Sequence, residues 1–254
     1  MKNKRIGKMG ELSWFIGVLL CALGVSLCTK ANFGLSTIAA PPYILHRFLV
    51  DKLPFFTQGF AEYVWQGSLL IVLTLILRRF RVRWLFSFFT AICCGFAIDM
   101  WLYLLGGNGA YESMVMRIIA FALGTVFTAL AIAFHFRTYI PLQVYELAVV
   151  EISDGFGFDT VKVKLVNDII MLAVSLALSG LLCGFSAGVG AGTVIAAFVN
   201  SPLIGLFGRL LDNFFVFDAR FPRLFAVLGG KQGEAIAESD AAESTETTTQ
   251  EASR

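Results

Sequence analysis

The sequence predicts an all-α fold: a polytopic membrane helix bundle with six spanning helices, two short broken segments and a 3+3 inverted repeat. Composition predicts the membrane class. Hydrophobic residues make up 57% of the 254 residues, charged residues only 15%, and the mean hydropathy is +0.76. A soluble domain has about 25% charged residues. The apolar residues are also gathered in separate stretches, and the order of these stretches repeats in the second half of the chain.

Six apolar stretches are expected to span the bilayer, because a helix needs about 20 mostly apolar residues to cross it. They are Leu12–Cys28, Gly59–Leu77, Trp84–Leu105, Met114–Phe134, Thr160–Cys183 and Ala191–Leu211. Two shorter segments, Leu35–Val50 and Ile140–Ile152, contain prolines and are too short and broken to be expected to cross. In the last span, Pro202 removes a backbone donor near the middle, which predicts either a packing kink or one wall of a polar site.

The segments outside the spans predict the orientation. Residues 1–11 form a basic lead, 12–212 the transmembrane domain, 213–228 an amphipathic segment on the membrane face, and 229–254 an acidic, disordered tail. The compact loop Arg78–Arg83 is expected in the cytoplasm, because loops rich in Lys and Arg stay there. With both termini inside, sixteen of the 20 Lys and Arg residues lie on the cytoplasmic side. We therefore expect an inner (cytoplasmic) membrane protein with both termini cytoplasmic.

The two halves of the transmembrane domain match. Repeat one (12–105) and repeat two (114–212) each contain a span, a short proline-bearing segment and two further spans. Because each half crosses three times, the copies must be inserted upside down relative to each other. Inverted repeats with a discontinuous segment in each half are typical of secondary transporters, whose site lies at the repeat interface. The alternative is a membrane-embedded scaffold or regulatory protein with no transport activity.

Polar residues inside the spans are the candidate site residues. An Asp charge in lipid would cost at least ~2.5 kcal/mol, so these side chains are expected to face the bundle interior. Asp99 is expected to face a cavity or a cation such as Arg117 or Lys162. Glu62, Lys162 and Lys164 lie closer to the interfaces and are expected to snorkel to them. The predicted substrate-binding residues are Gln66, Asp99, Asn167, Asp168 and Asn200.

Three motifs carry a family resemblance. The last span contains Gly190-Ala-Gly-Thr-Val-Ile-Ala-Ala-Phe198, followed by Ser201-Pro-Leu-Ile-Gly-Leu-Phe207. Lys30-Ala-Asn-Phe-Gly-Leu-Ser36 comes early in the chain, and Asp159-Thr-Val-Lys162 comes later. Together they resemble signatures of the YczE/YyaS/YitT-like family of bacterial multi-pass membrane proteins. The resemblance extends over residues 12–212. It implies a multi-pass membrane protein of undetermined activity.

Several function classes are not expected. The glycines at 184–192 lack the Gly-Lys-Ser/Thr ending of a phosphate loop, and the sequence contains neither a His-Glu-x-x-His nor a Gly-x-Ser-x-Gly motif. We therefore expect no enzyme activity, no metal and no cofactor. The glycines are expected to form a turn and a close helix contact. The expected partners are the lipid bilayer and an unidentified small solute; nucleic acid is excluded, and a homo-oligomer stays open.

Overall fold

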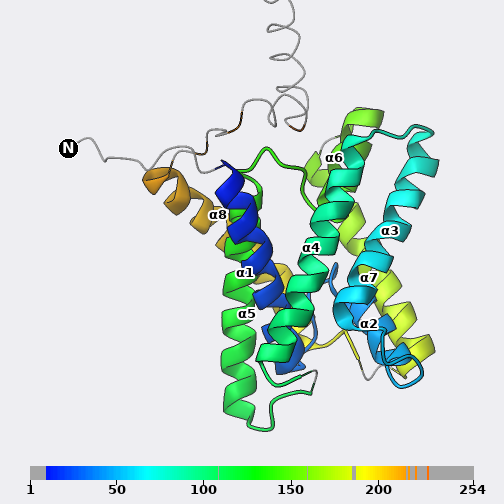
Figure 1. Ribbon diagram of the computed structural model, residues 1–254, viewed down its shortest axis with the longest axis vertical. Helices are drawn as coiled ribbons and strands as arrows, with labels where there is room; N and C mark the ends of the chain where they lie inside the picture. The colour runs from blue at the N-terminus through cyan, green and yellow to red at the C-terminus, as the bar shows by residue number, and fades with distance from the viewer. Residues whose placement is uncertain are drawn as a thin grey trace, which may run out of the picture.

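The computed structural model describes residues 10–107, 109–158, 160–184 and 187–215, together with Phe217, Phe221 and Leu228. The regular structure of these residues is entirely α-helical (Figure 1). The helices are α1 (Gly10–Ala31), α2 (Ala40–Leu49), α3 (Gln58–Leu77), α4 (Arg83–Leu104), α5 (Met114–His135), α6 (Val144–Phe156), α7 (Thr160–Cys183) and α8 (Ala191–Phe214). The predicted tail, the basic lead up to Met9 and most of the predicted interfacial segment lie outside the described residues.

Six of the described helices are long and apolar enough to cross a bilayer, which confirms the predicted number of spans. They are α1, α3, α4, α5, α7 and α8, with Val166–Cys183 as the apolar part of α7. Large apolar side chains on these helices face outward: Leu75, Leu181 and Phe198 are 70%, 83% and 77% exposed. So much exposed apolar surface matches lipid rather than water, and the chain is an integral membrane protein.

The two short segments are also helical, but their helices begin later than predicted. α2 begins at Ala40 with proline in its first turn, where a missing N–H costs no helical hydrogen bond. α6 begins at Val144, after Pro141, and ends at Gly157, which has the left-handed conformation (φ 70°). The connections before them, 32–39 and 136–143, are not helical. α8, by contrast, continues through Pro202 without interruption.

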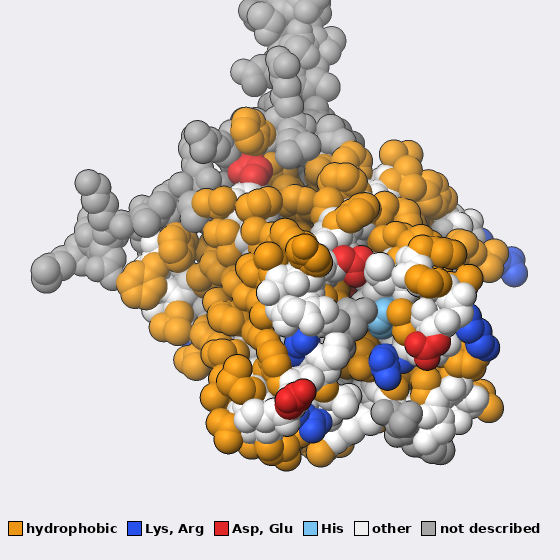
Figure 2. All heavy atoms as spheres, turned by 60° about the horizontal axis from the view of Figure 1, so that its bottom comes forward, with side chains coloured by type: hydrophobic (Ala, Val, Ile, Leu, Met, Phe, Trp, Pro, Cys, Tyr) orange, Lys and Arg blue, Asp and Glu red, His pale blue; other side chains and the backbone are white. Residues whose placement is uncertain are grey.

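Successive spanning helices alternate in direction, so the connections gather at two ends of the bundle (Figure 1). We call one end the basic end; it carries the start of α1, the connection between α3 and α4 with Arg78–Val82, α6 and the end of α8. The opposite end carries α2 and the connections after α4 and α7, and we call it the α2 end. Figure 2 looks onto the α2 end, where charged side chains gather, while hydrophobic side chains cover the flanks. The two short helices therefore lie at opposite ends of the bundle.

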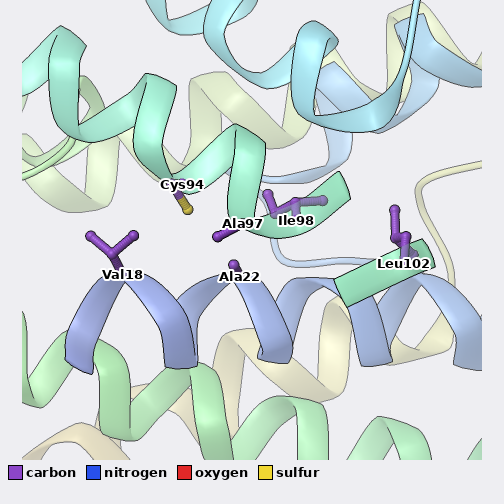
Figure 3. Packing of buried hydrophobic residues seen from close by; sticks show 6 residues of the cluster. All are labelled: Val18, Ala22, Cys94, Ala97, Ile98 and Leu102. Atoms are coloured by element: carbon purple, nitrogen blue, oxygen red, sulfur yellow. The ribbon is translucent and has the colours of Figure 1, made fainter. Parts of the chain in front are cut away.

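Small residues allow the central helices to pack closely. α1 packs against both α4 and α5. On the α4 side, Val18 and Ala22 face a buried row of α4 residues (Figure 3), which are Cys94, Ala97, Ile98 and Leu102. On the α5 side, Gly24 and Gly124 face each other so closely that a Cβ on Gly124 would lie 2.8 Å from the Gly24 carbonyl oxygen. Close backbone approach at small residues is a common way for helices to associate in membranes.

Replacing Gly124 with alanine should destabilise the bundle. The added Cβ would lie 2.8 Å from the Gly24 carbonyl oxygen and 2.7 Å from Cys28 Sγ, so α1 and α5 would have to separate. Overpacking of this kind costs about 1–3 kcal/mol. Gly205→Ala is the matched control, because a Cβ at Gly205 of α8 meets nothing within 4 Å. Thermal unfolding of the purified protein should show a loss for Gly124→Ala and none for Gly205→Ala; equal stability would contradict the close contact.

Candidate functional site

A cavity of about 150 Å³ lies among the helices, and residues of both predicted halves line it. Cys21, Val25, Ser36, Thr37, Ile38, Ala39, Glu62, Cys94 and Ile98 come from the first half, and Thr128, Ile132, His135, Gln143, Tyr145, Glu146, Asp168, Ala196, Asn200 and Ile204 from the second. We call this space the central cavity. A second cavity of about 160 Å³ adjoins it, because Ile38, Tyr145, Glu146 and Asp168 line both.

The two short helices bring their N-terminal residues to the central cavity. Ser36–Ala39 line it immediately before α2, while Gln143, Tyr145 and Glu146 line it at the start of α6. Because α2 and α6 lie at opposite ends of the bundle, each begins beside the shared cavity and continues toward its own end (Figure 1). The non-helical connections before them are the backbone irregularities that membrane proteins tolerate where such segments line a cavity.

A buried hydrogen-bond network forms one wall of the central cavity. Gln66 Nε2 donates to Glu62 Oε1 (3.1 Å) and to Gln143 Oε1 (2.8 Å), and the Val144 N–H donates to Gln66 Oε1 (2.9 Å). The Tyr145 hydroxyl donates to Glu62 Oε1 (3.0 Å). The network joins α3 of one half to the start of α6 in the other.

The structure distributes the five predicted site residues over four environments. Asp168 and Asn200 line the central cavity, and Asn167 lines the adjoining one. Gln66 is fully buried in the network behind the wall. Asp99 is not among the residues that line either cavity. The structure thus brings Asp168 and Asn200 together, places Asn167 and Gln66 beside them, and sets Asp99 apart.

Asp99 anchors the start of α3. Its Oδ2 accepts from the Thr57 hydroxyl (2.6 Å) and its Oδ1 accepts from the Gly59 N–H (2.8 Å). Thr57 is itself the N-cap of α3 and accepts from the Phe60 N–H. A carboxylate at a helix N-terminus is stabilised by the backbone donors and the helix dipole. The hydrogen bonds of Asp99 therefore run to a helix cap rather than to the cations expected from the sequence, and Arg117 instead donates to backbone carbonyls.

Replacing Asp99 with alanine should lower stability and leave the cavity intact. Two hydrogen bonds to a charged carboxylate would be lost, and hydrogen bonds of that kind contribute about 1.5–3 kcal/mol each. Asp51→Ala, at an exposed position in the connection after α2, controls for the loss of a negative charge. Thermal unfolding in detergent is the measurement. An Asp99→Ala protein as stable as the Asp51→Ala protein would contradict the anchoring role.

The sequence interpretation of Glu62 is wrong. Glu62 is only 5% exposed and lines the central cavity, so it does not snorkel to an interface. Glu62 and Gln66 are four residues apart and therefore share one face of a helix. Because Gln66 was predicted to face inward, this spacing in the sequence could have indicated that Glu62 faces inward as well. Lys162 is exposed, as expected of a snorkelling residue, and the side chain of Lys164 lies outside the described part of the structure.

Other cavity residues were also missed. His135, Gln143, Tyr145 and Glu146 line the central cavity, and His135 is only 6% exposed. All four lie at or beyond the end of the apolar span α5. In that region, hydropathy does not distinguish a polar residue at a cavity from a polar residue in an exposed connecting loop. The proline before Gln143 indicated a broken segment but not that its start is buried.

Two of the three motifs that carry the family resemblance meet at the α2 end. The Leu35 N–H donates to the Gly188 carbonyl (3.0 Å), and the Gly192 N–H donates to the Phe33 carbonyl (2.8 Å). A Cβ on Gly34, which has φ 104°, would lie 2.6 Å from the backbone nitrogen of Gly190. The described glycines of this segment thus make a close contact, but with the non-helical connection before α2 rather than the close helix contact that the sequence predicted. The third motif begins outside the described residues, at position 159.

The comparisons with known proteins agree with this architecture. The model of a family described as "Family of unknown function (DUF6198)" matches residues 9–209. The chain is similar to the "Uncharacterized protein YyaS" of Bacillus subtilis (strain 168), with 24% identity over 211 residues, which cover 82% of this chain and 96% of that protein. No solved structure matches. The resemblance to YyaS-like proteins read from the motifs is confirmed, and the chain belongs to the DUF6198 family.

Proposed function

We propose that this protein is a secondary transporter that carries a small solute across the cytoplasmic membrane. The observation that carries the proposal is the central cavity. Its lining comes from both halves of the chain, and the starts of both short helices reach it. Polar side chains inside a membrane bundle are costly, and they persist where they bind substrates, ions or one another. Discontinuous segments that meet at a shared polar site are typical of secondary transporters.

The packing of the helices supports an inverted repeat. If α1–α4 correspond to α5–α8, then α2 should contact α7 as α6 contacts α3, and both contacts occur. When α1–α4 are exchanged with α5–α8, the α2–α3 contact corresponds to the α6–α7 contact. The α1–α4 contact corresponds in the same way to the α5–α8 contact. α1 and α5, which would correspond to each other, also pack together. The opposite positions of α2 and α6 agree with copies of inverted orientation (Figure 1).

The proposed orientation places the basic end in the cytoplasm. Arg79 and Arg81 of this end both contact the Glu151 carboxylate on α6, at 3.6 and 3.5 Å. The positive-inside rule assigns such a loop to the cytoplasm. The adjoining cavity is lined by Phe136 from the connection after α5 and by Val150 of α6, so it lies on the basic-end side of the central cavity. It would be the route by which solute reaches the centre from the cytoplasm.

The competing proposal is a scaffold that uses these helices to hold a partner. A scaffold would place each polar side chain in an isolated, satisfied pair, and Asp99 fits that description. Asp168 and Asn200, by contrast, line one space together with Glu62 and Glu146. This convergence favours the carrier. An enzyme is not proposed, since the sequence contains no motif for a nucleophile or a metal.

Uptake into proteoliposomes tests the proposal. The purified full-length protein would be reconstituted and offered radiolabelled amines, carboxylates, neutral amides and vitamins, with protein-free liposomes as the control. We expect at least one solute to enter faster than it enters protein-free liposomes and to be displaced by its unlabelled form. If folded protein transports none of them, the scaffold becomes the better account.

A further inference from the structure

We propose that the central cavity binds a small organic ammonium ion, a protonated amine of about six non-hydrogen atoms. This inference rests on the proposed transport function and names the substrate class of the same site. It follows from four properties of the cavity: the charges on its wall, the state of its helix N-termini, the hydrogen-bonding atoms that face it, and its size.

The charged side chains on the wall are all acidic. Glu62 of α3, Glu146 of α6 and Asp168 of α7 line the central cavity, and no Lys or Arg side chain is among its described lining residues. Glu146 and Asp168 also line the adjoining cavity, so a solute that passes between the two cavities must pass them. Like charges that converge in a low-dielectric interior favour the binding of a cation.

The helix N-termini at the cavity do not offer an anion site. A free helix N-terminus binds anions through its unpaired N–H groups. In α2, however, the first turn contains Pro41 and Pro42, which have no N–H. The N–H groups of Ala39 and Ala40 just before them are hydrogen-bonded to the Ser36 carbonyl, at 3.1 and 3.0 Å. The donors that would attract a carboxylate or a phosphate are therefore missing or occupied.

At the start of α6, the first N–H group is occupied, and the ordinary helical hydrogen bonds begin at Leu147. The Val144 N–H donates to Gln66 Oε1 (2.9 Å), and the Leu147 N–H donates to the Gln143 carbonyl (3.1 Å). Glu146 lies in the first turn of this helix, where a carboxylate is itself the anion that the helix dipole favours. The second helix N-terminus thus carries its own negative group.

The wall of the central cavity offers hydrogen-bond acceptors to a ligand. Asn200 Oδ1 is buried and has no hydrogen-bond partner in the described part of the chain. His135 also lines the cavity and is only 6% exposed. Its Nε2 has no hydrogen-bond partner among the described residues. In the tautomer that carries its proton on Nδ1, this nitrogen accepts. Asn200 Oδ1 adds an acceptor beside the three carboxylates, which suits a ligand that donates, such as an ammonium group.

Three donors on the wall are directed to the protein. The Tyr145 hydroxyl donates to Glu62, and the Thr128 hydroxyl donates to the Gly124 carbonyl (2.8 Å). Gln143 Nε2 lies 3.5 Å from Cys94 Sγ and so faces a thiol. An anionic ligand would find these three donors already used, and it would lie beside three carboxylates.

The size and the apolar part of the cavity favour an organic cation over a bare metal ion. Its volume of about 150 Å³ equals that of a cavity that accommodates benzene, a molecule of about six non-hydrogen atoms. Apolar side chains from several helices supply the rest of the wall. They are Val25, Ile38, Ile98, Ile132 and Ile204. An aliphatic chain would contact these side chains while its ammonium group contacts the carboxylates.

Three probes of similar size and different charge test the inference: n-butylammonium, n-butyrate and n-butanol. Binding of each to the purified full-length protein would be measured by calorimetry and by the rise in its unfolding temperature. Glu146→Gln and Asp168→Asn, alone and together, remove cavity charges with little change in volume. Asp51→Asn removes a carboxylate at an exposed position and is the matched control. We expect n-butylammonium to bind, the control to bind equally, and the double variant to lose at least about tenfold in affinity, the order of one hydrogen-bonded charge contact.

Stronger binding of n-butyrate or n-butanol than of n-butylammonium would overturn the inference, and so would the absence of binding by n-butylammonium. Unchanged affinity in the folded double variant would also overturn it. Failure of the proposed transport function would give a different result from failure of this inference. In that case n-butylammonium would bind with the expected dependence on Glu146 and Asp168, but neither it nor any other solute would cross the bilayer of proteoliposomes.

Discussion

Replacing Gln66 with leucine should lower the free energy of unfolding by about 3 kcal/mol or more. Gln66 has no exposed surface, and its side chain makes hydrogen bonds to Glu62, Gln143 and the Val144 N–H. Leucine would leave Gln143 Oε1 and the Val144 N–H buried without their partner. Each such group costs about 1–3 kcal/mol, and the loss is larger when the groups belong to one network.

The control is Ser68→Ala, two residues along the same helix. Ser68 is exposed and its hydroxyl donates only to the Trp65 carbonyl of its own helix, so the expected change is within about 0.5 kcal/mol. Thermal unfolding in detergent, followed by circular dichroism, compares the variants. A Gln66→Leu protein as stable as the Ser68→Ala protein would mean that the network does not hold the start of α6 against α3.

Filling the central cavity should abolish transport without unfolding the protein. Ile204 lines the cavity, and a tryptophan at this position would occupy the space that a small solute needs. Leu206→Trp is the control, because Leu206 is on the same helix, is 52% exposed and does not line the cavity. We expect uptake of radiolabelled n-butylammonium by Ile204→Trp proteoliposomes to fall to the rate of protein-free liposomes, while the Leu206→Trp protein keeps its activity.

Both tryptophan variants would first be checked for folding by their unfolding temperature. A folded Ile204→Trp protein that transports normally would show that solute does not pass through the central cavity. Loss of activity in both variants would show instead that α8 tolerates no bulky residue, whichever way it faces.

The class of the fold could be predicted from the sequence because the bilayer imposes a strong and local condition. A spanning helix needs about 20 apolar residues, and each of the six helices meets that condition without reference to its neighbours. The short helices were also visible, since Pro41 and Pro141 interrupt apolar segments. The residues at which the two short helices begin could not be predicted in this way. They depend on contacts such as that between Val144 and Gln66, which are 78 residues apart in the chain.

The candidate site was predicted only in part, for the same physical reason. Hydropathy identifies Asp99, Asp168 and Asn200 as residues whose side chains are unfavourable in lipid, but two different arrangements can keep such a side chain out of lipid. Asp99 accepts hydrogen bonds from Thr57 and Gly59 at the N-terminus of α3, whereas Asp168 and Asn200 line a cavity. Which arrangement applies depends on the helix that packs opposite. The hydropathy of one segment does not contain that information.

The most direct test of the central claim is the accessibility of one cavity position from the two sides of the membrane. Ile204→Cys and Leu206→Cys would each be placed in a protein without its native cysteines, reconstituted in one orientation, and treated with a small charged thiol reagent from either side. A carrier exposes its central site to each side in turn. We therefore predict that Ile204→Cys reacts from both sides and is protected by n-butylammonium, while Leu206→Cys, which faces lipid, reacts from neither. Reaction of Ile204→Cys from one side only, or from neither, would contradict the account of the cavity as a carrier site.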